Sequence, residues 1–321
     1  MNTLIYGLQY GDEGKGRVSA YFSNEHEWSI RFNGGPNAGH TVWHNEKQYK
    51  LNHFPAGSVM GKKVALDAGM VIDPDKLYKE YETLDHKPQL YISSRAHIIT
   101  YEHLLADEDG SRIGSTKRGI AYVYRDKVLR DGRRVKEELQ NPSSALSLMN
   151  PTIYDGLPPI QANETAIYES AQGVMLDVDY GCYPYVTSSS VFPTVVHDIS
   201  QKIGVLKAYT SRVGDGPPNY PDIPQLRELG QEYGTITGRP RRCTWLVMDE
   251  LKYALSISKP DAIVITKLDI LKDLEEIKVW DNGKEVSIGN LNTYKEFLLD
   301  NVPNVKYFSE SADGDLIKLN G

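Results

Sequence analysis

The segment with the clearest potential for chemistry lies near the start of the chain. Residues 11–16 read Gly-Asp-Glu-Gly-Lys-Gly, after an apolar run at 4–8 and before a helical pattern at 17–22. Glycines at a strand-to-helix turn let backbone N–H groups approach a bound anion, and the N-terminus of the helix adds its dipole. Lys15 would contribute a positive charge to the same anion. The segment therefore predicts a phosphate-binding loop.

This loop differs from a Walker A sequence, because Gly16 stands where Ser or Thr would follow the lysine. Asp12 and Glu13 are also unusual there, since carboxylates repel phosphate. A bound metal ion or a proton transfer would explain their presence. We therefore expect chemistry on a phosphate group, and a glycine-rich turn with solvated charges is the alternative.

A second segment, residues 33–41, reads Asn-Gly-Gly-Pro-Asn-Ala-Gly-His-Thr and follows a predicted strand. It places His40 among small residues, where a histidine has little core to fill. Such a side chain could donate to a phosphoryl or oxo group. A purely structural histidine is the alternative.

A third segment, residues 234–242, concentrates three arginines in an acidic protein. Gly238 and Pro240 bend the chain, so these arginines do not share one helix face. Thr235 and Thr237 beside planar guanidinium groups suit a clamp for carboxylates or phosphates. A solvated basic loop is the alternative.

A fourth segment, Thr-Lys-Leu-Asp at 266–269, follows a predicted parallel strand. In GTP-binding folds, a lysine and an aspartate with this spacing recognise guanine. The carboxylate of Asp269 would accept from the base N–H groups, and the stem of Lys267 would stack on the ring. An aspartate that caps the strand end is the alternative. Together with the phosphate loop, this segment predicts a guanine nucleotide site.

Composition limits the class of protein. With 321 residues, 40% of them apolar, the chain can bury a large core. A formal net charge of −7 argues against nucleic acid as the main partner. Cys182 and Cys243 are too few for a disulfide framework or a zinc site. The N-terminus lacks a signal-peptide pattern and no apolar stretch has the length of a membrane span, so we expect a cytoplasmic protein.

The elements that must position these segments follow from the apolar runs. Strands are predicted at 4–8, 29–32, 64–66, 89–92, 166–168, 204–209 and 262–266, a hairpin at 41–51, and helices from 74 and at 244–257. Continuous apolar strands are typical of a parallel sheet that is covered on both faces. We therefore expect an α/β protein with a central, mostly parallel sheet, helices on both faces and functional loops at its carboxyl edge.

The chain is predicted to form a single catalytic domain over residues 1–321. Residues 102–165 are polar and suggest an excursion of helices and loops from that domain. Residues 277–321 suggest a small C-terminal appendage, with a strand–turn–helix unit at 277–306 and Asp-Asn-Gly as its turn.

In chain order, these segments resemble the adenylosuccinate synthetase family, the GTP-dependent ligases that join L-aspartate to IMP. The resemblance covers nearly the whole chain and implies the P-loop-NTPase-like fold of that family, with Mg²⁺ and GTP as its cofactors. Beyond the segments already described, it rests on Ile-Gly-Ser-Thr at 113–116, Asp-Lys-Val-Leu-Arg at 126–130, Ala-Gln-Gly at 171–173, Tyr-Pro-Tyr-Val-Thr-Ser at 183–188 and Ser-Arg-Val-Gly at 211–214.

The resemblance also implies roles for individual residues. Asp12 would be the general base at the purine N1 and, with the Gly39 carbonyl, a Mg²⁺ ligand. His40 would act as general acid or electrophile while the γ-phosphoryl group moves onto O6, beside Gln172. The substrate-binding residues would be Asn37, Ser115, Thr116, Arg130, Thr187, Val213, Thr235, Thr237, Gly238, Arg239 and Arg241. The nucleotide-binding residues would be Glu13, Gly14, Lys15, Gly16, Gly39, His40, Thr41, Arg241, Lys267, Asp269 and Ser309.

Arg130 resembles the family arginine that reaches the nucleotide of the partner subunit, so the resemblance implies a homodimer. A dimer of this kind would have two sites, each completed by the neighbouring chain.

Departures from the family pattern leave the acceptor open. Pro240 replaces an arginine, Ser-Glu-Ser at 309–311 replaces Ser-Thr-Gly, and residues 113–122 are altered. Such changes resemble those of viral relatives that join L-aspartate to dGMP, with ATP or dATP as the alternative donor. Those relatives commonly lose the aspartate that corresponds to Asp12. The retained Asp12 favours IMP and the intact segment 266–269 favours GTP, with dGMP ligation in a host cytoplasm as the alternative.

Two other classes of protein serve as distant alternatives. A GTP-binding switch would share the phosphate loop and the segment 266–269, but it would need neither the arginine segment nor His40. An inactive homologue would be expected to lack one of Asp12, His40, Gln172 or Arg239, and the chain has all four.

Overall fold

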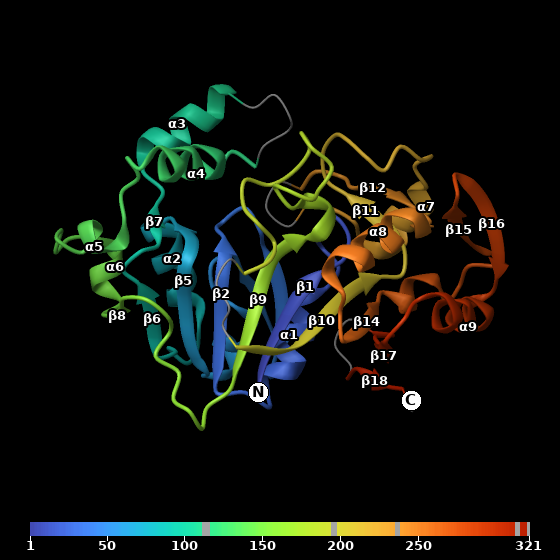
Figure 1. Ribbon diagram of the computed structural model, residues 1–321, viewed down its shortest axis with the longest axis horizontal. Coiled ribbons are helices and arrows are strands. Elements are labelled where there is room, and N and C mark those ends of the chain that lie inside the picture. Colours follow the sequence, from blue (N-terminus) through green and yellow to red (C-terminus); the bar gives the residue numbers. More distant parts are fainter. Residues whose placement is uncertain (111–115, 194–197, 235–237, 312–314, 320–321) are drawn as a thin grey trace.

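The computed structural model describes residues 1–110, 116–193, 198–234, 238–311 and 315–319, and its centre is a large sheet (Figure 1). In spatial order the strands are β18 (Ile317–Lys318), β17 (Val305–Phe308), β14 (Ala262–Thr266), β10 (Ile199–Lys207), β1 (Asn2–Gly7), β9 (Ala166–Gly173), β2 (Trp28–Gly34), β5 (Lys63–Ile72), β6 (Leu90–Ser93) and β8 (Thr152–Tyr154), and β7 (His97–Ile98) pairs with β5. Among these described strands, every neighbouring pair is parallel except β17 and β18. The predicted α/β class is therefore confirmed.

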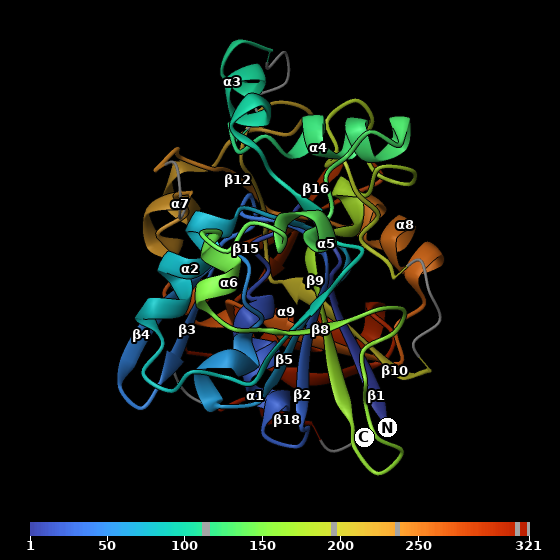
Figure 2. The ribbon, with the colours of Figure 1, turned by 90° about the vertical axis from the view of Figure 1, so that its left-hand side faces the viewer.

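Helices and smaller sheets surround this centre. The helices are α1 (Lys15–Ser23), α2 (Pro74–Thr83), α3 (Tyr101–Gly110), α4 (Ile120–Leu129), α5 (Val135–Glu138), α6 (Ala145–Leu148), α7 (Pro224–Gly230), α8 (Met248–Ser258) and α9 (Leu291–Asn301), with 3-10 turns η1 (Ala56–Met60), η2 (Val174–Leu176) and η3 (Leu268–Leu271). The smaller sheets are β3 (His40–His44) with β4 (Lys47–Leu51), β11 (Thr210–Arg212) with β12 (Arg242–Thr244), and β13 (Leu246–Val247) with β15 (Ile277–Asp281) and β16 (Lys284–Gly289). Figures 1 and 2 show α3 and α4 above the carboxyl ends of the strands, opposite the N-terminus.

Strand β1 shows why the sequence of the sheet is continuously apolar. Leu4 and Tyr6 join a core cluster that includes Leu251 of α8. Ile5 joins a different cluster, which includes Val18 of α1. Because successive side chains of a strand point to opposite faces, α8 and α1 cover opposite faces of the sheet. This confirms the prediction of helices on both faces.

The parallel order brings distant chain segments to one edge. Strand β1 pairs with β9 on one side and β10 on the other, and β10 pairs with β14. All four strands run in the same direction, so the glycine-rich loop after β1, Gln172 at the end of β9 and Lys267 after β14 lie at the carboxyl edge. Ligands of open α/β sheets bind at this edge.

The predicted helix at 244–257 is wrong at its start, since α8 begins at Met248. Thr244 pairs with Thr210 in the hairpin of β11 and β12, and Leu246 belongs to β13, which pairs with β15. Backbone pairing with distant strands overrides the local helical pattern at these residues.

The C-terminal segment contains the predicted strand, turn and helix. Asn282 and Gly283 form the turn between β15 and β16 with φ values of 48° and 70°. After α9, the chain returns to the main sheet, because β17 pairs with β14. The predicted excursion at 102–165 contains most of α3, all of α4 to α6 and the edge strand β8. Among the described residues, no helix has the length and apolar character needed to cross a bilayer.

Tyr294 offers a test of how α9 is held to the sheet. It is fully buried, and its phenol donates to the Ala208 carbonyl at 2.6 Å. We expect Tyr294→Phe to lower the free energy of unfolding by about 1 kcal/mol, because a buried carbonyl loses its partner. Urea denaturation measures this change.

The matched control is Tyr253→Phe, because the phenol of Tyr253 donates to the Tyr180 carbonyl at 2.7 Å from a side chain that is 44% exposed. Water can replace that bond, so we expect a change below about 0.5 kcal/mol. Equal losses in the two variants would contradict the role of burial.

Candidate active site

The carboxylate of Glu13 turns inward and organises the glycine-rich loop. One oxygen accepts from the backbone N–H of Gln9 at 3.1 Å and of Gly11 at 2.8 Å, and the other accepts from Lys15 Nζ at 2.6 Å. Glu13 is fully buried, and hydrogen bonds to a charged acceptor are strong. The side chain is therefore engaged within the loop, and its contact with a nucleotide stays a prediction.

Two glycines enclose this carboxylate. A Cβ atom on Gly7, at the end of β1, would lie 2.2 Å from Oε2 of Glu13. A Cβ atom on Gly173, at the end of β9, would lie 2.3 Å from its Oε1. Both positions therefore require glycine for steric reasons.

The loop is joined directly to the end of β14. Thr266 Oγ1 donates to the Glu13 carbonyl at 2.6 Å, and Gly14 packs against the same threonine. The next residue, Lys267, has a φ of 61° and its ammonium donates to the Gly230 carbonyl at 3.3 Å. Burial lowers the pKa of Lys267. The predicted guanine-binding lysine thus lies beside the predicted phosphate loop.

Asp269 and Ser309 lie next to this lysine. Asp269 is in η3, where the backbone N–H of Leu268 donates to the Ser309 carbonyl at 3.3 Å. The Arg17 guanidinium of α1 donates to the Ser311 carbonyl. The structure therefore brings both ends of the predicted nucleotide site to the same corner of the sheet.

His40 packs against the C-terminal end of the loop. A Cβ atom on Gly16 would lie 2.5 Å from Cδ2 of His40, so glycine permits the close approach of the ring. Its Nε2 is 3.6 Å from Oε1 of Glu169, which is ion-paired with Arg31 at 2.5 Å. Burial lowers the pKa of His40, and the Glu169 carboxylate opposes this effect. Gly39 and Thr41 flank His40 at the start of β3.

Asp12 is connected to a buried charge network through Arg241. Its carboxylate is 2.9 Å from Nε of Arg241, whose Nη1 donates to Glu232 at 2.7 Å. Glu232 also accepts from Lys207 at 2.8 Å and from the phenol of Tyr209. Burial raises the pKa of Glu232, but the cations Lys207 and Arg241 lower it by more, so that it is about 2. Arg241 is therefore held in place from its buried side.

Two amide side chains meet beside the loop. A Cβ atom on Gly34 would be 3.6 Å from Oε1 of Gln172 and 3.9 Å from Oδ1 of Asn37. The amide oxygen of Asn37 accepts from the Gly35 N–H at 3.2 Å. Within the described residues, Oε1 of Gln172 is buried and has no hydrogen-bond partner. A buried acceptor oxygen without a partner could accept a hydrogen bond from an N–H group of a ligand.

Thr187 and Val213 lie in two different chain segments, and the side chain of Arg212 connects these segments. The Arg212 guanidinium donates to the Tyr185 carbonyl at 2.7 Å and lies 4.7 Å from the ring centre of Tyr10. Because Tyr10 directly precedes the glycine-rich loop, both segments lie beside that loop.

Apart from Arg130, the remaining predicted substrate-binding residues lie between α3 and α4, in the segment 234–242, or outside the part of the chain that the structure describes. Thr116 lies in the connection from α3 to α4, Gly238 has a φ of 63°, and the Arg239 carbonyl accepts from Gly234 at 2.8 Å. Ser115, Thr235 and Thr237 lie outside the described residues.

Arg130 lies at the end of α4 in a basic pocket of about 230 Å³ that no residue of the glycine-rich loop lines. Besides Arg130, this pocket is lined by His97, Lys127, Gly132, Arg134, Lys136 and Glu137.

Sequence reasoning missed four buried charges around the site, those of Arg31, Glu169, Lys207 and Glu232. Arg31 and Lys207 interrupt apolar strands, and a charge inside such a strand was the available signal. Glu232 lies outside any apolar run or motif, so only the tertiary structure reveals it.

The residues present fit a Mg²⁺ ion that also contacts nucleotide phosphates. Within the described residues, no group of three or more His, Cys, Asp or Glu side chains could hold a metal. Mg²⁺ commonly uses only one or two protein carboxylates together with phosphate oxygens and water. The Asp12 carboxylate is 34% exposed at the loop and is a suitable ligand of that kind.

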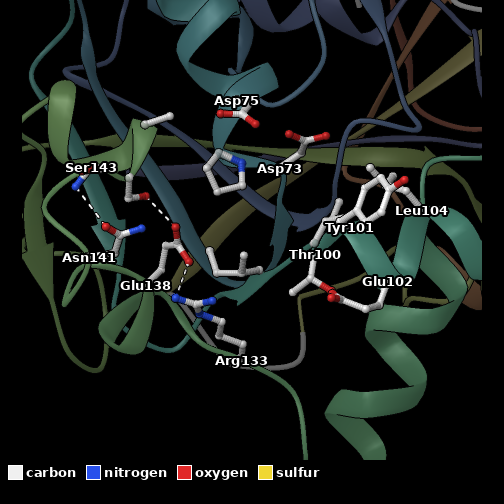
Figure 3. Close-up of a pocket in the computed structure, with 15 residues that line it drawn as sticks. Asp73, Asp75, Thr100, Tyr101, Glu102, Leu104, Arg133, Glu138, Asn141 and Ser143 are labelled. Atoms are coloured by element: carbon white, nitrogen blue, oxygen red, sulfur yellow. Dashed lines mark hydrogen bonds and ion pairs between the residues drawn. The ribbon is translucent and has the colours of Figure 1, made fainter.

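A cavity of about 460 Å³ lies apart from this loop, between the N-termini of α2 and α3 and the segment of α5 and α6 (Figure 3). Asp73, Asp75 and Glu102 line it, together with Arg133 and Glu138, which form an ion pair at 2.9 Å. None of the predicted site residues lines this cavity. It is therefore distinct from the candidate active site.

The fold and loop define an α/β nucleotide-binding protein with its site at the carboxyl edge of a parallel sheet. The chain matches the adenylosuccinate synthetase family model over residues 4–155 and 157–284. It is 36% identical to the adenylosuccinate synthetase of Thermotoga maritima over 89% of this chain and 86% of that protein. It is 38% identical to that of Thermosipho africanus over 87% and 82%. The chain belongs to the adenylosuccinate synthetase family, as its motifs predicted.

Two solved structures share the fold. The fully ligated adenylosuccinate synthetase from Plasmodium falciparum has a TM-score of 0.86 at 29% identity, over 99% of this chain and 100% of that chain. Cyanophage S-2L succinoaminodeoxyadenylate synthetase, bound to dGMP and dATP as an energy donor, has a TM-score of 0.81 at 22% identity, over 98% and 94%. The second likeness concerns the fold alone.

The buried network of Glu232 predicts a pH dependence of stability. The pKa of Glu232 is about 2 in the folded protein, below the ordinary value of about 4.3. Its stabilisation is therefore complete above about pH 4.3 and is lost as the pH falls towards 2. We expect Glu232→Gln to lower the free energy of unfolding at pH 7 by about 3 kcal/mol, because two buried cations lose their carboxylate.

Urea midpoints of both proteins from pH 7 to pH 3 measure this effect. The difference between them should shrink as the pH falls, and a constant difference would contradict the assignment. Glu228→Gln, at an exposed position on α7, is the control and should change the free energy of unfolding by less than about 0.5 kcal/mol.

Proposed function

We propose that this protein is a GTP- and Mg²⁺-dependent ligase that joins L-aspartate to IMP in the cytoplasm, giving adenylosuccinate, GDP and phosphate. Family membership supports this proposal. The observation that carries it is the convergence of the glycine-rich loop, His40, Gln172, Arg241 and segment 266–269 at one edge of the sheet. A GTP-binding switch would not need His40 or the arginine segment.

The chemistry begins with the purine. The C6–O6 group of IMP is a poor electrophile, so O6 must first be converted into a leaving group. Asp12 would remove the N1 proton, and the charge that develops on O6 would attack the γ-phosphoryl group of GTP. The bond from the γ-phosphorus to the bridging oxygen of GDP breaks as the bond to O6 forms. Lys15 and His40 would stabilise the transferred group.

The second step completes the ligation. The neutral amine of L-aspartate attacks C6 of the 6-phosphoryl intermediate, and the C6–O6 bond breaks as phosphate leaves with the O6 atom. The proton that the amine loses passes to solvent. The arginine segment that contains Arg239 and Arg241 would hold the two carboxylates of aspartate. Mg²⁺, held by Asp12 and the Gly39 carbonyl, would neutralise charge on the phosphates. Binding three substrates at one sheet edge would supply much of the acceleration through proximity.

The alternative acceptor is dGMP, with ATP or dATP as donor. The cyanophage enzyme that shares this fold was determined with dGMP and dATP. The retained Asp12 favours IMP, and Lys267 with Asp269 beside the phosphate loop favours GTP. Phosphate release with Mg²⁺ and L-aspartate, measured for IMP, dIMP, GMP and dGMP with each donor, decides between them. Faster turnover of dGMP than of IMP would overturn our first choice.

Substitutions of Asp12 and His40 test the proposed chemistry. We expect Asp12→Ala and His40→Ala each to lower kcat by at least about 100-fold, because each removes a group that acts on a proton or on developing charge. GTP binding, measured by isothermal titration calorimetry, should persist. Asp300→Asn, at an exposed position on α9, is the control and should retain full activity. Near-normal turnover of either alanine variant would exclude the mechanism.

We also propose a homodimer in which Arg130 completes the neighbouring site. Arg130 lines a basic pocket with Lys127 and Arg134, which suits a phosphate group supplied from another chain. The two residues before it, Val128 and Leu129, are 78% and 58% exposed, and a partner surface would cover them.

Mixing two impaired variants, assayed at an IMP concentration well below the wild-type KM, tests this arrangement. We expect Arg130→Ala to raise the KM for IMP at least about 10-fold, because the phosphate loses a cationic partner. In a 1:1 mixture of Arg130→Ala and Asp12→Ala chains, one site of each mixed dimer is intact, so about a quarter of wild-type activity should return. Sedimentation equilibrium checks that both variants are dimers. A mixture without recovered activity would exclude the shared site.

A further inference from the structure

We infer that Glu232 is a positioning residue for Arg241: its carboxylate fixes the guanidinium at the place where a carboxylate of L-aspartate would bind, and so sets the affinity for that substrate. This inference rests on the proposed function, in which Arg241 belongs to the segment that holds L-aspartate. It concerns a side chain that no sequence motif marks and that is fully buried behind the site.

Main-chain hydrogen bonds place Glu232 directly opposite Arg241. The backbone N–H of Arg241 donates to the Glu232 carbonyl at 2.9 Å, and the Arg241 carbonyl accepts from Nε of Arg227 at 2.7 Å. Tyr233 and Pro240, the neighbours of this pair, form an isolated antiparallel bridge. Opposite residues of two antiparallel segments carry their side chains close together, so the backbone itself brings the carboxylate to the guanidinium.

The two oxygens of the Glu232 carboxylate have separate partners. Oε2 accepts from Nη1 of Arg241 at 2.7 Å. Oε1 accepts from Nζ of Lys207 at 2.8 Å and from the phenol of Tyr209. Lys207 and Tyr209 are themselves buried, so they shield Oε1 from water. The carboxylate is therefore fixed through one oxygen and holds Arg241 through the other.

On the side of the glycine-rich loop, Arg241 is held much less firmly. Its Nε is 2.9 Å from Oδ2 of Asp12, yet within the described residues this buried nitrogen has no hydrogen-bond partner. The two groups are therefore in charge contact without an aligned hydrogen bond. An N–H group in this state can donate to a carboxylate oxygen of a ligand. Because Glu232 holds Nη1, Nε stays directed at the loop while its partner there is exchanged.

Burial of Glu232 also has a purely structural explanation, in which the carboxylate only joins β10 to the segment after α7. Both explanations predict a loss of stability when the network is broken. They differ in the effect on the substrate, because a positioning residue acts on L-aspartate only through Oε2 and Arg241. Tyr209→Phe is therefore a matched control, since it removes a donor to Oε1 and leaves the contact of Oε2 with Arg241.

The test compares Glu232→Gln with Tyr209→Phe. In Glu232→Gln, the amide oxygen would stay with the two donors at the Oε1 position, so the NH₂ group would face the guanidinium, donor against donor. We expect this variant to raise the KM for L-aspartate at least about 10-fold, because a charge-assisted hydrogen bond is lost. Its kcat should fall less than about three-fold, since binding rather than the chemical step is affected. Tyr209→Phe should lower the urea midpoint but keep the KM for L-aspartate within about two-fold.

A double-mutant cycle shows whether the effect passes through Arg241. In an Arg241→Gln background, Glu232→Gln should not raise the KM for L-aspartate further. Lys207→Met combined with Glu232→Gln removes a buried cation together with the carboxylate, so it should recover stability without recovering affinity for L-aspartate. This variant supplies the measurement if Glu232→Gln alone does not fold. Equal rises of KM in both Arg241 backgrounds, or an equal rise in Tyr209→Phe, would overturn the inference.

Rotation of the Arg241 guanidinium about its Nε–Cζ bond gives a readout that is independent of activity. NMR exchange between the two Nη groups measures this rotation, and the signal that is missing in Arg241→Gln identifies the residue. Glu232→Gln should speed the rotation at least about 10-fold, because the bond that holds Nη1 is lost, whereas Tyr209→Phe should leave it nearly unchanged. Unchanged rotation in Glu232→Gln would contradict the inference. If the wild type releases no phosphate with L-aspartate and a purine monophosphate, the proposed function fails, and the rotation still shows whether Glu232 holds Arg241.

Discussion

The burial of the Glu13 carboxylate between two strand ends is the constraint on which the site depends. Glycines at the ends of β1 and β9 leave just enough room for this group, and the loop N–H groups and Lys15 turn towards it. A carboxylate in this position fixes the curvature of the loop. The backbone carbonyl of Glu13 joins the loop to β14, because it accepts from Thr266 Oγ1.

The same principle governs the other charges at this edge. Glu169 is balanced by Arg31, and Glu232 is balanced by Lys207 and Arg241, so each buried carboxylate has a cation within hydrogen-bond distance. Removing one partner from such a group costs several kcal/mol, because an unpaired charge is left in a medium of low polarity. The groups that would carry out the chemistry, Asp12 and His40, each attach to one of these balanced sets from its more exposed side.

Sequence reasoning predicted the strands and the edge of the sheet at which the motif residues lie better than the side-chain contacts among the buried charges. The apolar runs identified the strands, and the motif residues meet at the predicted edge because parallel strands end there together. The start of α8 was missed because Thr244 pairs with a strand far away in the chain. The role of the Glu13 carboxylate was also not evident, because the pattern places two carboxylates in the loop and does not show which of them faces inward. Arg31 had a local signal, a charge inside an apolar strand, whereas Glu232 acts through contacts that no local pattern encodes.

The position of Arg241 connects the proposed base to the proposed aspartate clamp. Its guanidinium is shared between Glu232, which is 1% exposed, and Asp12, which is 34% exposed. Exchanging a partner costs less where water already reaches the charge, so a ligand carboxylate or a metal ion would displace the contact with Asp12 before that with Glu232. Arg241 would then stay in place while Asp12 is released to bind Mg²⁺ and take the N1 proton. The buried network would therefore keep the proposed clamp fixed, and the exposed contact would be the one that substrate binding changes.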